Sequence, residues 1–245
     1  MPFTLSHAAA AWPVRKLLPA LPLSALVIGT LSPDFEYFLE LAPISRTGHT
    51  PAGLILFCLP VSLLVWVVFR RVARPALVRL LPPGLAAAVA PPSTSWSLAA
   101  VAALIGALTH VIWDGFTHQR DWAVRTIPFL RIPVAPGLLG GVPWYKLLQQ
   151  ISSVAGLAAI VLWVAWWVGS QPSAARRWAP GQWTRVRRTL IGIAAGTLIC
   201  AAANGALTRG PGVNASRVAV GGMIGASLSM LVIGLAGQWS RRRGA

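Results

Sequence analysis

Acidic residues and histidines are scarce in this chain and are absent from its second half. Five Asp or Glu and four His occur among 245 residues. All of them lie within the first 121 residues: His7, Asp34, Glu36, Glu40, His49, His110, Asp114, His118 and Asp121. These side chains bind metals and transfer protons. We therefore expect one membrane domain, 1–245, with any chemistry in residues 1–121 and a helical scaffold in 122–245.

Charged residues of both signs are also few, which excludes an ordinary soluble domain. Only 11% of the residues are charged, 56% are hydrophobic, and the mean hydropathy is +0.66. Soluble domains carry about a quarter charged residues. Twelve tryptophans suit a bilayer interface. The two cysteines, Cys58 and Cys200, lie in apolar runs without CxxC spacing, so we interpret them as buried hydrophobes.

The net charge of +16 has two readings. A high pI can indicate nucleic-acid binding. Here the basic residues cluster beside apolar runs, as in Arg70, Arg71 and Arg74 and in Arg241, Arg242 and Arg243. That placement favours membrane topology and contact with anionic lipids. We expect membrane lipids and no nucleic acid as partners.

Five apolar segments approach the ~20 residues that a span needs. They are about Ala52–Phe69, Ser97–Trp113, Ile151–Val168, Leu190–Leu207 and Val218–Gly237. Two further stretches, Leu17–Leu31 and Pro75–Pro91, are interrupted by prolines and fit re-entrant helices, although either could be a sixth span. The sequence predicts an all-α polytopic integral membrane bundle of five to six spans with short re-entrant or interfacial helices.

Basic residues also predict the orientation. The loops after the first and third spans and the C-terminal tail hold 12 of the 21 basic residues on one side. The positive-inside rule makes that side cytoplasmic. The N-terminal region and the 114–150 loop then face outward, away from the cytoplasm. No small-x-small cleavage site follows Leu31, so we expect the N-terminal stretch to be retained.

The clearest chemical motif closes the second expected span, at residues 110–118. His110 and Asp114 are four residues apart and share one face of a helix. An imidazole and a carboxylate at this spacing can bind one divalent cation. His118 adds a third side chain if Gly115 lets the chain bend back. The alternative is a His–Asp hydrogen bond at a membrane surface.

Three shorter pieces are weak when taken alone. Asp34 follows Pro33, which would aim its carboxylate, but taken alone this position favours a helix N-cap. His49 could be a solvated loop residue at the membrane boundary. His7 could be a surface residue of a short helix. In the five-span topology, however, all these residues and the His110–His118 motif lie on one side, which favours one shared site.

The opening MPFTLSHAA, residues 23–38 and the His110–His118 stretch resemble a family of bacterial multi-span membrane proteins of unknown function. More distantly, the order of His7, Asp34, Gly48-His49-Thr50 and His110-x-x-x-Asp114 is similar to membrane-bound metal-dependent hydrolases. Those share a His-x-x-x-Asp signature with zinc-dependent phospholipase C. This resemblance implies a helical fold that gathers the ligands at one pole. The metal ligands it implies are His7, Asp34, His49, His110 and Asp114.

These residue types suit zinc or another transition metal such as manganese, and the short supply of histidine favours one or two ions. The expected function is a membrane-bound metal-dependent hydrolase of phosphoester bonds in lipid-like substrates. Glu36 or His118 would transfer protons, and Arg46 and Arg120 would neutralise phosphate. Two alternatives are a proton or metal-ion transporter and a non-enzymatic assembly factor.

Overall fold

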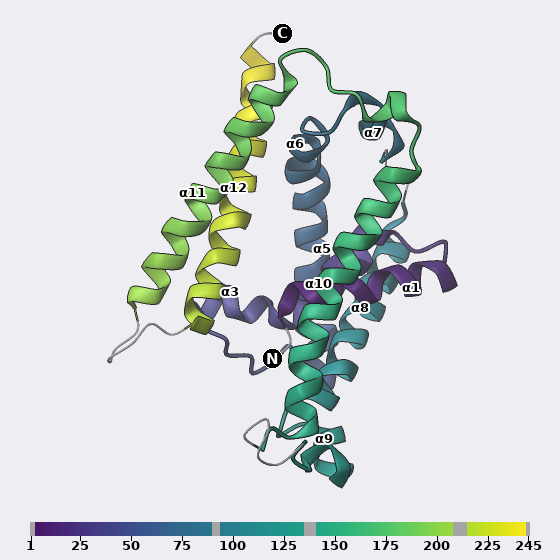
Figure 1. The fold of residues 1–245 in the computed structure, drawn as a ribbon, viewed down its shortest axis with the longest axis vertical. Coiled ribbons are helices and arrows are strands. Elements are labelled where there is room, and N and C mark those ends of the chain that lie inside the picture. Colours follow the sequence, from purple (N-terminus) through teal and green to yellow (C-terminus); the bar gives the residue numbers. More distant parts are fainter. Residues whose placement is uncertain (1–2, 90–93, 135–140, 208–214, 244–245) are drawn as a thin grey trace. The chain divides into compact units, whose positions relative to one another are not determined.

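Helices dominate the part of the chain that the structure describes. This computed structural model describes residues 3–89, 94–134, 141–207 and 215–243. Within these ranges, five helical stretches are long and apolar enough to cross a membrane (Figure 1). They are Pro51–Val78, Trp96–Thr126, Trp144–Ser170, Gln182–Ala206 and Ala215–Trp239. Each overlaps one of the expected spans, so the prediction of an all-α polytopic membrane protein is confirmed.

The chain forms two compact units that interleave in sequence. The first contains residues 1–33, 47–63 and 94–166, and the second contains residues 34–46, 64–93 and 167–245. The motif at 110–118, His7 and His49 all belong to the first unit. The expectation of a single domain stays a prediction.

The N-terminal segment of the first unit consists of three short helices and does not form a span. They are η1 (Thr4–Ala10), α1 (Ala11–Leu17) and α2 (Leu23–Leu31). Pro19 and Pro22 lie between α1 and α2, where a missing N–H and a fixed φ oppose helix continuation. Of the two alternatives for Leu17–Leu31, the structure therefore favours short helices.

Close packing of α2 on α8 (Trp96–Thr117) holds this segment in place. Gly29 lies directly against the backbone of Ala103, and Gly106 lies against the carbonyl group of Leu26. The two glycines lack a Cβ, and this lets the backbones approach each other. The contact fixes the end of α2 beside the part of α8 that carries His110.

Two π-helical segments interrupt the first span, which runs through α4 (Pro51–Gly53), η3 (Leu54–Cys58), α5 (Leu59–Val68), η4 (Phe69–Ala73) and α6 (Arg74–Val78). Pro60 and Pro75 follow the two π segments, η3 and η4, respectively. Each proline removes one backbone donor and crowds the preceding turn, which widening of the helix relieves. The Pro75–Pro91 stretch continues through α6 into α7 (Pro83–Ala88), with residues 90–93 outside the described part.

The rest of the first unit surrounds the C-terminal end of α8. Two short helices, α9 (Trp122–Thr126) and η5 (Pro128–Arg131), follow α8. The long helix α10 (Trp144–Ser170) comes next in the chain. Gln149 on α10 donates a hydrogen bond to the carbonyl group of Thr117 at 3.3 Å. This bond links α10 to the last turn of α8.

The second unit is built around an α11–α12 hairpin, with α11 at Gln182–Ala206 and α12 at Ala215–Arg243 (Figure 1). Small residues line the contact; Gly225 of α12, for example, lies on the backbone of Gly196. The unit also contains η4, α6 and α7, together with the shorter helices α3 (Glu36–Glu40) and η6 (Ser173–Arg176). No histidine belongs to this unit, which is consistent with a scaffold role.

We predict that Gly106→Ala destabilises the first unit. The added Cβ would collide with the carbonyl oxygen of Leu26, and overpacking of this kind costs about 1–3 kcal/mol. Thermal unfolding in detergent measures the effect. The matched control is Gly192→Ala, a helical glycine of α11 with no neighbouring atom within 4 Å of the added Cβ. Equal unfolding temperatures for both variants would contradict the close approach of α2 and α8.

Candidate metal centre

The centre begins with two side chains on one face of α8. His110 and Asp114 are each only 1% exposed. His110 Nε2 lies 3.3 Å from Asp114 Oδ2, as the i,i+4 spacing predicts. On the other side of the ring, His110 Nδ1 donates a hydrogen bond to the carbonyl oxygen of Thr30 at 2.7 Å. Because a carbonyl only accepts, the proton sits on Nδ1, and a neutral His110 presents an Nε2 lone pair to the carboxylate.

A short, tightly turned loop brings His49 to the same point. Gly48 lies against the backbone of Pro33, and the thiol of Cys58 donates to the Gly48 carbonyl at 3.3 Å. After His49, the side chain of Thr50 caps α4 by accepting a hydrogen bond from the amide of Gly53 at 2.9 Å. The loop is therefore anchored on both sides of His49.

Three atoms at this point form an equilateral triangle. His49 Nε2 is 3.3 Å from His110 Nε2 and 3.3 Å from Asp114 Oδ2, and His110 Nε2 is also 3.3 Å from Asp114 Oδ2. These separations exceed the ~2.7–2.9 Å of a charge-assisted hydrogen bond. They equal the spacing of about 3.3 Å between two ligands of a tetrahedral ion with metal–ligand distances near 2.0–2.1 Å.

The protons available to the triangle also favour a cation. Carboxylate oxygen Oδ2 offers only lone pairs, and neutral His110 has its proton on Nδ1. Within the triangle, only His49 can then donate a hydrogen bond, either to His110 Nε2 or to Asp114 Oδ2. A divalent cation would accept lone pairs from all three atoms at once. Without a cation, His110 Nε2 would also need a proton in order to donate a hydrogen bond to the carboxylate.

His7 approaches the other oxygen of the same carboxylate. It is 6% exposed, and its ring stacks on that of His110 with 3.7 Å between centroids and 13° between planes. Its Nε2 is 3.4 Å from Asp114 Oδ1, and neither atom has a hydrogen bond to any described residue. Burial, and next the neighbouring imidazole of His110, lowers the pKa of His7 to about 3. The ring is therefore neutral at physiological pH, the form that coordinates metals.

His7, His110 and Asp114 consequently offer a second set of ligand atoms, grouped closely enough to hold an ion. Asp114 and His110 are both common to this set and to the triangle; Asp114 offers two oxygens, but His110 offers only the one lone pair of Nε2. A carboxylate shared in this way can bridge two metal ions. Three ligand atoms are thus available to one ion, whereas a second ion would have only His7 and the other oxygen of Asp114 from these residues, and the number of ions stays a prediction.

His118 completes the cluster at its exposed edge. It follows the last residue of α8, and its Nδ1 lies 3.1 Å from the carbonyl oxygen of Asp114 and 3.5 Å from Asp114 Oδ2. The chain can turn here because Gly115 leaves space for the indole of Trp122. The His118 side chain is 25% exposed. Every histidine in the chain thus lies around Asp114.

The alternatives for the single residues are partly resolved. His7 is buried, so the interpretation as a surface residue is wrong. The cap of α3 is Phe35 rather than Asp34, which lies in η2 (Ser32–Phe35) and is 1% exposed. Asp34 opens the second unit, directly after Pro33, and its role as a ligand stays a prediction.

Glu36 has a structural role that the sequence does not reveal. Its carboxylate accepts hydrogen bonds from the Ser45 hydroxyl at 2.5 Å and the Arg46 amide at 2.7 Å. These bonds close the loop after α3 in the second unit. The predicted roles of Glu36 in proton transfer and of Arg46 in binding phosphate remain untested.

Two neighbours of the centre are not among the site residues predicted from the sequence. Thr30 contributes a backbone carbonyl, for which no side-chain pattern gives a signal. Asp121 lies 3.7 Å from His118 Nδ1 through its Oδ2, and its spacing of three residues from His118 was the available signal.

The chain belongs to a family defined by a domain of unknown function, DUF4184, whose model matches residues 1–235. No protein of curated function and no solved structure matches the chain. Membership agrees with the resemblance to an uncharacterised family. It supplies no activity, so the function rests on the geometry of the centre.

We predict that Asp114→Asn removes bound metal without unfolding the protein. Asparagine keeps the shape but loses the charge shared by all four histidines. Metal affinity should fall at least about tenfold, because loss of outer partners alone costs about 10–100-fold. Metal analysis after gentle detergent purification provides the measurement.

The matched control is Asp121→Asn, the same change at a side chain that is 42% exposed. It should keep the metal content of the wild type. If Asp114→Asn and the wild type contain equal metal, Asp114 is a hydrogen-bond partner and not a ligand.

Proposed function

We propose that this protein is a membrane-bound, metal-dependent hydrolase that cleaves a phosphoester bond in a lipid-like substrate. The triangle of His49 Nε2, His110 Nε2 and Asp114 Oδ2, with all three sides at 3.3 Å, carries the proposal. Imidazole nitrogens with a carboxylate are the ligands of zinc, and manganese would also suit them. A divalent ion held there would supply Lewis acidity and lower the pKa of a water molecule.

The remaining residues divide between holding the ion and assisting the reaction. His7 would extend the ligand set around the shared carboxylate of Asp114, and Asp34 is a further candidate ligand. His118 would exchange protons with the substrate or solvent, because it contacts Asp114 and is still 25% exposed. Glu36 is the second candidate for proton transfer.

Support for an anionic substrate comes from the residues after His118. Gln119, Arg120 and Arg125 line a hollow of about 420 Å³. Guanidinium groups bind phosphate through paired N–H donors. Arg120 lies two residues from His118 in the chain, so an anionic group bound here would lie near the metal centre.

The site would face the extracytoplasmic side of a bacterial inner membrane. Asp114 is three residues from the end of α8, so its span would leave the bilayer beside the centre. A centre at this level meets lipid headgroups, where phosphoester bonds lie. The excess of arginine in the loops on the opposite side supports this orientation.

Labelling of single introduced cysteines tests the orientation. We predict that an impermeant thiol reagent labels Gln119→Cys from outside intact cells and labels Ala174→Cys only in inverted vesicles. Both positions are exposed. The wild-type chain, whose Cys58 is buried and Cys200 partly buried, serves as the background control. The reverse pattern would place the centre on the cytoplasmic side.

Hydrolysis tests the proposed reaction. Protein in lipid nanodiscs should cleave phosphatidic acid or phosphatidylglycerol, lose activity with a chelator and regain it with zinc or manganese. His118→Gln should lower kcat by about 10²–10⁴-fold, the usual contribution of general acid–base catalysis, while metal content stays unchanged. Bound metal without cleavage of either lipid would instead favour metal-ion transport.

A further inference from the structure

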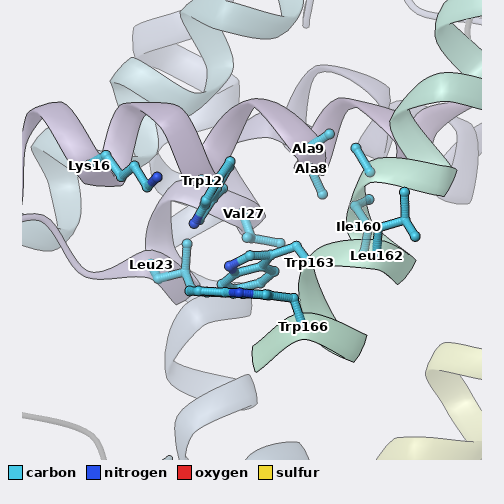
Figure 2. Close-up of a pocket in the computed structure, with 11 residues that line it drawn as sticks. Ala8, Ala9, Trp12, Lys16, Leu23, Val27, Ile160, Leu162, Trp163 and Trp166 are labelled. Carbon is cyan, nitrogen blue, oxygen red and sulfur yellow. The ribbon is translucent and has the colours of Figure 1, made fainter. Parts of the chain in front are cut away.

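An apolar groove runs along the first unit, close to the metal centre. Its volume is about 560 Å³, within the roughly 300–1,000 Å³ of typical ligand sites. Residues of η1, α1, α2 and α10 line it, and Figure 2 shows the rings of Trp163 and Trp166 facing Trp12, Lys16 and Leu23. All these elements belong to one unit.

The groove starts beside a proposed metal ligand. Ala8 and Ala9, which directly follow His7 in η1, line one end of it. Ser6 lies against Gly156 of α10, and farther along, the rings of Trp12 and Trp163 lie 6.4 Å apart. From Gly156 to Trp166, α10 rises by about 15 Å at 1.5 Å per residue. The groove thus leads away from the metal centre along α10.

The lining suits hydrocarbon. None of the lining residues is acidic, and Lys16 is the only one with a charge. The Lys16 ammonium lies 4.0 Å from the ring centroid of Trp12, a cation–π contact that leaves its aliphatic stem beside the groove. Leu162 and Trp166 remain 68% and 65% exposed, so apolar surface is accessible here.

The lining of the groove favours a single hydrocarbon chain as its occupant. A hydrocarbon chain needs no polar partner, which matches a lining without acidic residues and with one cation, Lys16. Such a chain also explains why the groove is apolar along its length while its start adjoins a site for an anionic group.

We propose that the groove binds one acyl chain of an anionic phospholipid while the phosphoester of the same molecule lies at the metal centre. This inference rests on the proposed function, whose substrate class it specifies. Ala8 and Ala9 are the lining residues next to His7 in the chain, and their small side chains leave room for an acyl chain at that end. The groove would therefore make cleavage depend on the length of the acyl chain.

Photolabelling tests the binding without requiring cleavage. Phosphatidylglycerol with a diazirine on one acyl chain is incorporated into nanodiscs with the protein and irradiated. Labels should concentrate on residues 8–27 and 159–166, at least fivefold above the exposed Leu198 and Ile199 of α11. Ala159→Trp, which fills the groove, should reduce this labelling at least fivefold.

The matched control is Val161→Trp, which adds the same indole to a 65% exposed position of α10 outside the groove lining. It should leave the labelling unchanged. In hydrolysis, Ala159→Trp should slow cleavage of dioleoyl phosphatidylglycerol at least tenfold but not cleavage of a water-soluble nitrophenyl phosphoester. Unfolding temperature and metal content establish that both variants fold.

The outcomes separate the two proposals. Groove labelling that Ala159→Trp suppresses, without any hydrolysis, supports the binding and rejects the reaction. Labelling equal to that of α11 and insensitive to Ala159→Trp overturns the acyl-chain site, even if the protein hydrolyses lipid. Equal loss of labelling in Val161→Trp also overturns it, because the effect would then belong to the general lipid-facing surface.

Discussion

The buried carboxylate of Asp114 is the constraint on which the first unit depends. An ionised group removed from water carries a penalty of several kcal/mol unless partners or a cation offset it. The partners come from three separate parts of the chain: η1, the loop before α4, and the end of α8. Each delivers an imidazole to within 3.5 Å of one oxygen or the other. Satisfying this charge therefore requires the tertiary fold, and in turn stabilises it.

The sequence predicts what local patterns determine. Long apolar runs identify the five spans, and the four-residue spacing places His110 and Asp114 on one face. The convergence of His7 and His49 was predicted from their placement on one side of the membrane and from the absence of histidine elsewhere in the chain. The stacking of His7 on His110 and the carbonyl of Thr30 depend on the packing of α2 against α8, for which neighbouring residues in sequence give no signal. Whether Leu17–Leu31 crosses the bilayer was ambiguous for the same reason, because the apolar residues of α2 suit burial in protein as well as in lipid.

Irregular backbone occurs where the centre needs it. A 3₁₀ helix carries His7, a capped turn carries His49, and a π-helical segment follows that turn. Regular helices such as α11 and α12 pack through small residues and bear no histidine or acidic residue. This division agrees with the expectation that irregular structure at membrane depth lies within protein or beside a polar site. It also explains why half of the chain can dispense with acidic residues and histidine.

One segment serves both the metal centre and the groove. Within η1, His7 faces Asp114, and the next two residues line the groove, so an occupant of the groove stabilises the segment that carries a ligand. A metal ion bound to His7 would likewise order the groove wall. Two ligands that order the same segment share the entropic cost of ordering it, which makes their binding mutually favourable. Linkage requires this coupling to be reciprocal, so lipid should tighten metal binding as much as metal tightens lipid binding.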